Sequence, residues 1–152
     1  MTVFKAAAVL ALVGLSACSA TVSGGSGGAG PNRFIASNNM VVYGDPSVPG
    51  RFEVQQRAGR GGSDYWCAAG EYAIQGMGVG PASRIYLETP YGAGYLSNSG
   101  KTAGFTVAPD AQLQAAAAAQ SNGLTMSIKR VGENWGAEHA RTQCPTFFDP
   151  LR

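Results

Sequence analysis

Charged side chains are scarce in this sequence. Asp, Glu, Lys and Arg together make up 13% of its 152 residues, and 11 basic against 9 acidic residues leave a formal net charge of +2. A protein that binds nucleic acid through its phosphates carries a marked basic excess, clustered on one face. This balance therefore argues against nucleic acid as a partner.

Metal-ligating residues are equally few. The chain has one histidine, His139, and three cysteines, Cys18, Cys67 and Cys144. It contains no C-x-x-C pair and no cluster of carboxylates, which are the patterns typical of zinc sites, calcium loops and thioredoxin-like dithiols. We therefore expect no metal and no cofactor.

Long apolar runs are also missing. The run from Ala6 to Leu15 is shorter than the about 20 residues that a membrane-spanning helix needs. It follows a single positive charge, Lys5, and leads into small residues that end at Cys18. These are the three zones of a secretory signal, so the sequence predicts export.

Four residues of this segment, Leu15-Ser16-Ala17-Cys18, resemble the lipobox of bacterial lipoproteins. The resemblance implies that residues 1–17 are removed as a signal peptide and that Cys18 is acylated, with palmitate among its chains. Several acyl chains on one residue exceed what stable membrane anchoring requires. The implied location is the bacterial cell envelope, with the domain in the periplasm, and Ser19 favours the outer over the inner membrane. The alternative is an ordinary secreted protein cleaved at a nearby small residue.

Two regions follow the signal. Residues 18–31 begin with Cys18 and continue as a Ser/Gly-rich tract without charge or apolar periodicity, which indicates a flexible tether. Residues 32–152 have the size of one small domain and contain no second linker.

Periodicity along this domain predicts strands and helices in alternating groups. Apolar alternation and turn residues predict strands over residues 33–44, 51–57, 83–90, 102–109 and 124–131, the first two as a hairpin. Helices are expected over residues 65–76, 111–120 and 135–144. Ser63 or Asp64, then Asp110 and Asn134, are the expected caps of these helices. This order predicts an α+β fold, an antiparallel sheet of about five short strands with two to three helices packed on one face.

Two cysteines remain once Cys18 is lipidated. Cys67 is expected at the start of the first helix and Cys144 at the end of the last. An even pair in an exported domain usually forms a bridge, so we expect a disulfide between them.

The alternative is that Cys67 is a catalytic thiolate. A glycine-rich loop that leads into a cysteine at a helix start resembles the nucleophile position of cell-wall cysteine peptidases of the NlpC/P60 type. The resemblance implies a cell-wall cysteine hydrolase. It fails beyond about fifteen residues, because Ser83, Arg84 and Ile85 stand where that family has its histidine and His139 lies in the last predicted helix.

Three further residues are candidates for ligand binding. Arg60 belongs to a loop, "GRGGSD", that could hold an anion, whereas glycines needed for a tight turn explain the same loop. Tyr91 and Tyr95 lie in a glycine-rich loop and could contact a glycan or another small ligand. The other aromatic and basic residues that could line such a groove are Tyr65, Trp66, Tyr72, Tyr86, Trp135, Arg51, Arg57 and Arg84. A place in the core is the competing interpretation for these aromatic residues.

Taken together, these features predict a membrane-anchored envelope lipoprotein that acts as a non-enzymatic structural or binding module. Its partners would be the membrane, through Cys18, and an envelope protein or peptidoglycan. The alternatives are the cysteine hydrolase that uses Cys67 and a glycan- or small-ligand-binding domain.

Overall fold

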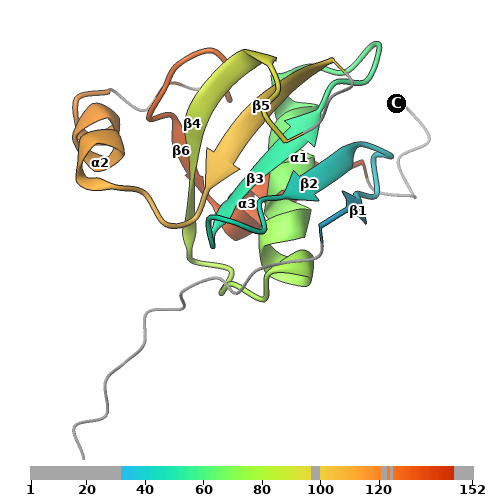
Figure 1. Ribbon diagram of the computed structural model, residues 1–152, viewed down its shortest axis with the longest axis horizontal. Helices are drawn as coiled ribbons and strands as arrows, with labels where there is room; N and C mark the ends of the chain where they lie inside the picture. Colours follow the sequence, from blue (N-terminus) through green and yellow to red (C-terminus); the bar gives the residue numbers. More distant parts are fainter. Residues whose placement is uncertain (1–31, 97–99, 121–122, 124, 146–152) are drawn as a thin grey trace, which may run out of the picture.

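The computed structural model describes residues 32–96, 100–120, 123 and 125–145. The predicted signal peptide, Cys18 and the predicted tether lie outside these residues. The described residues form one antiparallel sheet of six strands, in the order β1-β2-β3-β5-β4-β6, together with three α-helices (Figure 1). The α+β class is thus confirmed, with slightly more strands than the sequence predicts.

The elements follow one another in the order that the sequence predicts for most of the domain. The strands are β1 (Phe34–Ile35), β2 (Val41–Gly44), β3 (Arg51–Gln55), β4 (Arg84–Ala93), β5 (Lys101–Thr106) and β6 (Asn134–Gly136). The helices are α1 (Gly62–Glu71), which continues as a π-helical turn (Tyr72–Gly76), α2 (Ala111–Ala118) and α3 (Ala137–Arg141).

The first predicted strand is two strands. β2 pairs with β3 as the expected hairpin, but residues 36–40 turn the chain back so that β1 pairs antiparallel with β2. Asn39 adopts a φ of +61°, a conformation that asparagine tolerates better than most residues. The Asn38 side chain fixes the turn, since its Oδ1 accepts from the Met40 N–H at 3.1 Å and its Nδ2 donates to the Asp64 carbonyl at 2.7 Å.

Two of the expected caps are wrong. The first helix begins at Gly62 with Gly61 as its N-cap, so neither Ser63 nor Asp64 caps it. Asp64 acts from inside the first turn instead, where its carboxylate accepts from the Gly61 N–H at 2.9 Å. Asn134 lies in β6, and Gly136 precedes α3. The cap of the second helix is confirmed, because Asp110 Oδ1 accepts from the Leu113 N–H at 2.7 Å.

The predicted strand over residues 124–131 is also wrong. Its described part, residues 125–131, contains no strand. Met126 and Ile128 do pack against the core, as their alternation predicts. The backbone is bound through isolated contacts: Ile128 O accepts from the Tyr91 N–H at 2.7 Å, and Ser127 O accepts from Trp66 Nε1 at 3.0 Å. The sixth strand forms only after Gly132, whose φ of +86° redirects the chain.

The core lies between the sheet and the helices α1 and α3. Trp66, Tyr65 and Tyr72 of the α1 region are at most 1% exposed, which favours the core interpretation for these three aromatic residues. Phe105 of β5 packs edge-on against Trp66 with the ring centroids 4.9 Å apart, and it stacks beside Phe52 of β3 at 5.8 Å. Interlocked rings of this kind contribute beyond their buried area.

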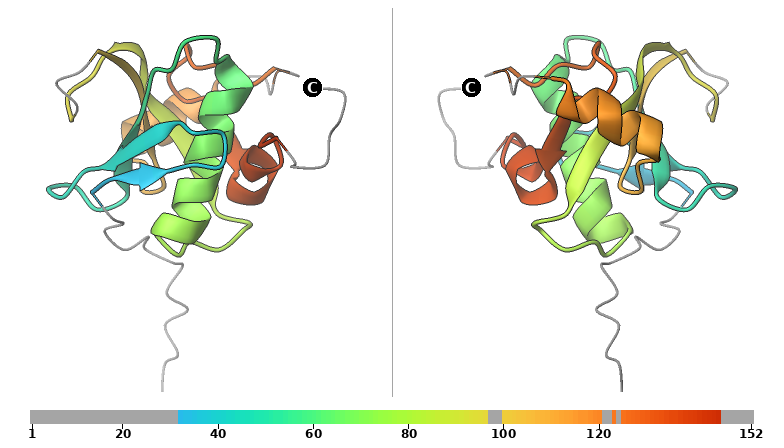
Figure 2. Two further views of the ribbon diagram at one scale, coloured as in Figure 1. Left: turned by 90° about the vertical axis from the view of Figure 1, so that its right-hand side faces the viewer. Right: turned by 90° about the vertical axis from the view of Figure 1, so that its left-hand side faces the viewer.

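The remaining helix, α2, lies beside the other face of the sheet. Ile85 and Leu87 of β4 are fully buried in the core, so the residue between them, Tyr86, points to the opposite side. Tyr86 lines a cleft together with residues of α2, which places α2 on that side, next to β4 (Figures 1 and 2). Leu113 is the buried apolar anchor of α2. Two of the three helices therefore share one face of the sheet.

Helices α1 and α3 touch through their backbones. A Cβ atom added at Gly70 would lie 2.8 Å from Ala137 O and 2.9 Å from Ala140 C, and closer still to Arg141 N. Real Cβ atoms do not approach backbone atoms this closely. Glycine at position 70 is thus a condition of the α1–α3 contact.

We expect Gly70→Ala to lower the free energy of unfolding by about 2–3 kcal/mol, because the added methyl group forces the two helices apart. Gly80→Ala is the matched control, since a Cβ there meets only Ser83 Oγ at 3.8 Å. Urea denaturation of both variants under non-reducing conditions measures the difference. Equal stabilities would contradict the backbone contact.

Candidate functional site

The hydrolase hypothesis depends on Cys67, which is joined to Cys144 by a disulfide. The two Cα atoms are 4.8 Å apart and 77 residues separate the cysteines in sequence. Cys67 is 0% exposed and lies in the second turn of α1, because the helix begins at Gly62. The unpaired N–H groups of a helix start lower the pKa of a thiol close to them. The N–H of Cys67 comes after these unpaired groups. A cysteine in a disulfide has no thiolate to act as a nucleophile.

His139, the base that such a hydrolase would need, has another partner. Its ring stacks on Trp135 with the centroids 4.9 Å apart and the planes 13° from parallel. It sits on the exposed side of α3, whereas Cys67 is enclosed between α1 and α3. The structure does not assemble the Cys–His pair of a cysteine hydrolase.

The disulfide instead stabilises the domain, because it closes a large loop of the chain. In the chain-entropy treatment, closing a loop of 77 residues stabilises the folded state by about 4.5 kcal/mol.

We expect a reductant to lower the free energy of unfolding by roughly this amount, measured by urea denaturation. A Cys67→Ala/Cys144→Ala double variant should be insensitive to the reductant. An equal response of both proteins would contradict this role of the bridge.

Arg60 forms an ion pair with Asp64, with Nη1 and Oδ1 3.1 Å apart. The other oxygen of the same carboxylate accepts from the Gly61 N–H. A carboxylate of the chain thus already occupies the helix start that the sequence suggested for an anion. The glycines of this loop serve the turn into α1.

Tyr91 packs toward the core side of the sheet. Its N–H donates to Ile128 O at 2.7 Å, and its ring meets the edge of Tyr65 at a centroid distance of 5.9 Å. Lys101 Nζ lies 5.8 Å from the centre of the Tyr91 ring. These contacts give Tyr91 a structural role at the ends of β4 and β5.

Tyr95 is 43% exposed and borders a polar cluster around Glu53 on the outer face of the sheet. The fully buried Glu53 carboxylate accepts from the N–H groups of Tyr95, at 2.8 Å, and Leu96, at 3.0 Å. The Arg51 guanidinium lies over the Tyr95 ring, 4.9 Å from its centre. Burial raises the pKa of the Tyr95 hydroxyl. Tyr95 therefore fastens the loop after β4 to β3, and it does not join Tyr91 or Arg60 in a common site.

Arg51 is in turn held by Asp45. The Asp45 carboxylate accepts from Arg51 Nε at 2.7 Å and Nη2 at 2.5 Å, and from the Ser47 and Val48 N–H groups. Desolvation by burial would raise the pKa of Asp45, but the bonds from Arg51 and the two backbone N–H groups outweigh it, so the pKa is lowered. The ionised carboxylate is the form that fits this turn.

This lowered pKa predicts how acid acts on the domain. Ionised Asp45 adds stability above the pKa of an unfolded Asp, about 3.9, and this contribution is lost as the pH falls through the lower folded-state pKa. We expect Asp45→Asn to be less stable than the wild type at neutral pH and to lose less stability on acidification to about pH 3. Urea denaturation at both pH values measures this difference. Glu138→Gln, which removes an exposed ion pair with Arg141, is the control and should follow the wild type. An Asp45→Asn variant as acid-sensitive as the wild type would contradict the assignment.

A polar cleft lies between α2 and the β4–β6 edge of the sheet. We call it the α2 cleft. It has a volume of about 500 Å³ and is lined by Arg84, Tyr86, Gln114, Ala117, Ala118, Gln120 and Asn134. Tyr86 and Asn134 are register partners on neighbouring strands, so their side chains lie on the same face. The sequence had suggested Arg84 and Tyr86 as groove residues, whereas the three amides were missed because they come from separate elements.

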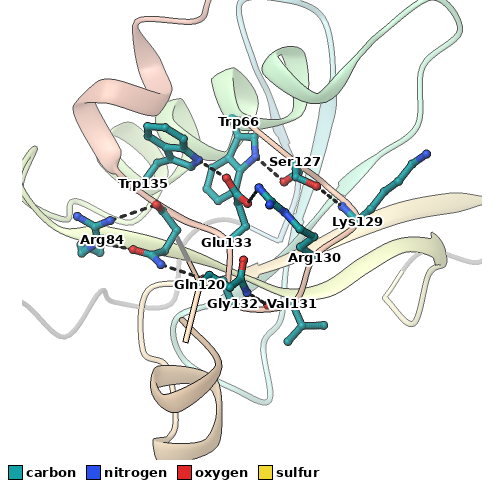
Figure 3. A network of polar contacts seen from close by, with 11 residues as sticks. Trp66, Arg84, Gln120, Ser127, Lys129, Arg130, Val131, Gly132, Glu133 and Trp135 are labelled. Atoms are coloured by element: carbon teal, nitrogen blue, oxygen red, sulfur yellow. Dashed lines mark hydrogen bonds and ion pairs between the residues drawn. The ribbon is translucent and has the colours of Figure 1, made fainter. Parts of the chain in front are cut away.

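The polar side chains of the α2 cleft are held in place by bonds within the chain. Arg84 donates from Nε to Asn134 Oδ1 at 2.6 Å and from Nη2 to Asn134 O at 3.1 Å. Asn134 Nδ2 donates to Gly132 O at 2.9 Å, and Gln120 Nε2 donates to Val131 O (Figure 3). Gln114 Nε2 donates to Pro109 O at 3.0 Å. Their orientations are thereby fixed.

Gly132 brings the two walls of this cleft together. A Cβ at this position would lie 2.8 Å from Ala116 C and 2.8 Å from Ala117 N. The loop before β6 therefore rests directly on the backbone of α2. An ion pair of Arg130 with Glu133 at 2.6 Å, and a bond from Trp135 Nε1 to Glu133 Oε1 at 3.0 Å, fix the same loop on its other side (Figure 3).

A second cleft, of about 340 Å³, lies on the opposite face of the same edge strand. It is lined by Ser63, Thr125, Met126, Trp135, His139 and Gln143. Trp135 points into it because successive residues of β6 face opposite sides. One face of the Trp135 ring is already covered by His139. Only the other face of the Trp135 ring is therefore left for a ligand of the second cleft.

No protein-family model matches this chain, and comparisons with curated proteins and with solved structures give no match either. Among the described residues, no helix is both long and apolar enough to cross a membrane. Nor does this part of the chain bring three or more His, Cys, Asp or Glu side chains together in a group that could hold a metal ion.

Proposed function

We propose that this chain is a lipid-anchored, non-enzymatic binding module of the bacterial cell envelope. Cys18 anchors it in the membrane, with the outer membrane favoured, residues 18–31 tether it, and the folded domain lies in the periplasm. The observation that carries the proposal is the disulfide that joins the buried Cys67 to Cys144.

The disulfide supports this function in two ways. Structural disulfides persist in oxidising compartments such as the periplasm and are rare in the cytosol, which agrees with the export signal. The bridge also uses the sulfur that the hydrolase alternative needs as its nucleophile. Binding is then favoured over a purely structural role by the α2 cleft, whose polar side chains are oriented in advance and face solvent.

Mass spectrometry of the membrane-extracted chain tests the proposal. We expect Cys18 to be the N-terminal residue and to carry acyl mass, and Cys67 and Cys144 to be alkylated only after reduction. Cys18→Ser is the control, because it should leave the disulfide intact and abolish both acylation and membrane association. Density separation of the two membranes checks the outer-membrane location.

Two results would overturn parts of this proposal. An unmodified Cys18 in a chain that is recovered in the soluble fraction would overturn the anchor. Alkylation of Cys67 without a reductant would overturn the bridge and lead to assays for hydrolysis of cell-wall fragments.

A further inference from the structure

We infer that the α2 cleft is a binding site for a glycan segment that carries a carboxylate. The inference rests on the proposed function, because an envelope module is surrounded by such glycans, of which peptidoglycan is one source.

The aromatic surface of the α2 cleft comes from Tyr86. Tyr86 lines the α2 cleft beside Asn134, and among the described rings the close ring pairs do not include it. Its ring is therefore not committed to the aromatic core. A sugar ring has an apolar face of C–H groups and a rim of hydroxyls, so an aromatic side chain set among polar groups matches both parts.

Planar polar groups line the α2 cleft together with Tyr86. Gln114, Gln120 and Asn134 each present an amide, which both donates and accepts, as vicinal hydroxyls require. Because internal bonds already orient these amides, a ligand loses little additional side-chain entropy on binding. Ala117 and Ala118 add only methyl groups to the wall of α2, which leaves the cleft open.

One acceptor on a residue that lines the α2 cleft is unsatisfied. Gln120 Oε1 is buried and has no hydrogen-bond partner, while its Nε2 is fixed on Val131 O. A buried acceptor without a partner is unfavourable, so a donor that reaches it is favoured. This oxygen has less than 1 Å² of accessible surface, so neighbouring side chains must shift before a sugar hydroxyl or an acetamido N–H in the α2 cleft can donate to it.

The charge on the described lining of the α2 cleft is positive. Among the described residues that line the α2 cleft, Arg84 carries a charge and no side chain is a carboxylate. Its guanidinium uses Nε and Nη2 on Asn134, which leaves Nη1 for a ligand. A guanidinium held in this way recognises a carboxylate through a charge-assisted bond and disfavours a cation.

Binding by the detergent-solubilised full-length chain tests the inference by calorimetric titration. The acidic probes are soluble peptidoglycan fragments from muramidase digestion and a galacturonic acid oligomer, and the neutral probe is chitotetraose. We expect the affinity for an acidic probe to be at least about tenfold higher than that for chitotetraose, since one hydrogen bond to a charged group changes the affinity by about this factor. Binding of the galacturonic acid oligomer alone would assign the source to an acidic polysaccharide other than peptidoglycan.

Variants assign the binding to the α2 cleft. Arg84→Gln should lower the affinity for the acidic probe about tenfold and change the affinity for chitotetraose by less than about twofold. Tyr86→Ala should weaken both probes. Gln114→Ala should also weaken both, and because this residue is exposed on α2 the change does not threaten folding. The matched controls Arg57→Gln and Tyr43→Ala, on other parts of the domain, should bind as the wild type does.

Three results would overturn the inference: no binding of any probe, equal affinity for acidic and neutral probes, or wild-type affinity in both Tyr86→Ala and Gln114→Ala. None of these results affects the anchor or the disulfide, because mass spectrometry detects those directly. Conversely, a chain without acyl mass that still binds the acidic probe would overturn the anchor and retain the site.

Discussion

The attachment of α3 to α1 is the constraint on which the rest of this domain depends. Two features make it: the bridge between Cys67 and Cys144, and the backbone contact that glycine at position 70 allows. Because α3 follows β6 without a linker, fixing α3 also fixes the edge strand. β6 in turn places Asn134 beside Tyr86 and Arg84. A covalent bond in the core side of the molecule thus determines the shape of a polar cleft on the other side of the sheet.

The two faces of the sheet are stabilised by different physics. The face toward α1 is packed with interlocked aromatic rings, whose burial provides the hydrophobic free energy of the fold. The outer face carries a buried carboxylate, Glu53, and the Asp45–Arg51 pair, each satisfied by several hydrogen bonds. Buried polar groups of this kind hold loops in one arrangement as long as every partner is present. The domain therefore combines an apolar side that provides cohesion with a polar side that fixes geometry.

Local signals in the sequence were sufficient for part of this structure. The fold class, the hairpin of β2 with β3 and the Asp110 cap follow from period-two alternation and from residues that act within a few positions. The segment around Met126 and Ile128 shows the limit of such signals. Its alternation correctly predicts burial, yet its backbone bonds go to α1 and to the end of β4, so it forms no strand.

Most of the candidate site could not be predicted from local sequence patterns, because its residues also meet through contacts between distant parts of the chain. Arg60, Tyr91 and Tyr95 stand out in the sequence, but each has a partner within the fold. The amides of the α2 cleft carry no sequence signal, because Gln114 and Asn134 are 20 positions apart and converge only through the sheet register and the contact at Gly132. A glutamine on an alanine-rich helix looks like an ordinary surface residue until the opposite wall is known.

The positions of the two cysteines along the chain also determine when the bridge can form during folding. Cys67 precedes β4, β5, α2 and β6, whereas Cys144 follows α3, so a chain that emerges N-terminus first presents one sulfur long before the other. During that interval α1 has no α3 to pack against, and its cysteine is a free thiol that can attack other disulfides. The last helix to appear is thus the one that makes the first helix chemically inert.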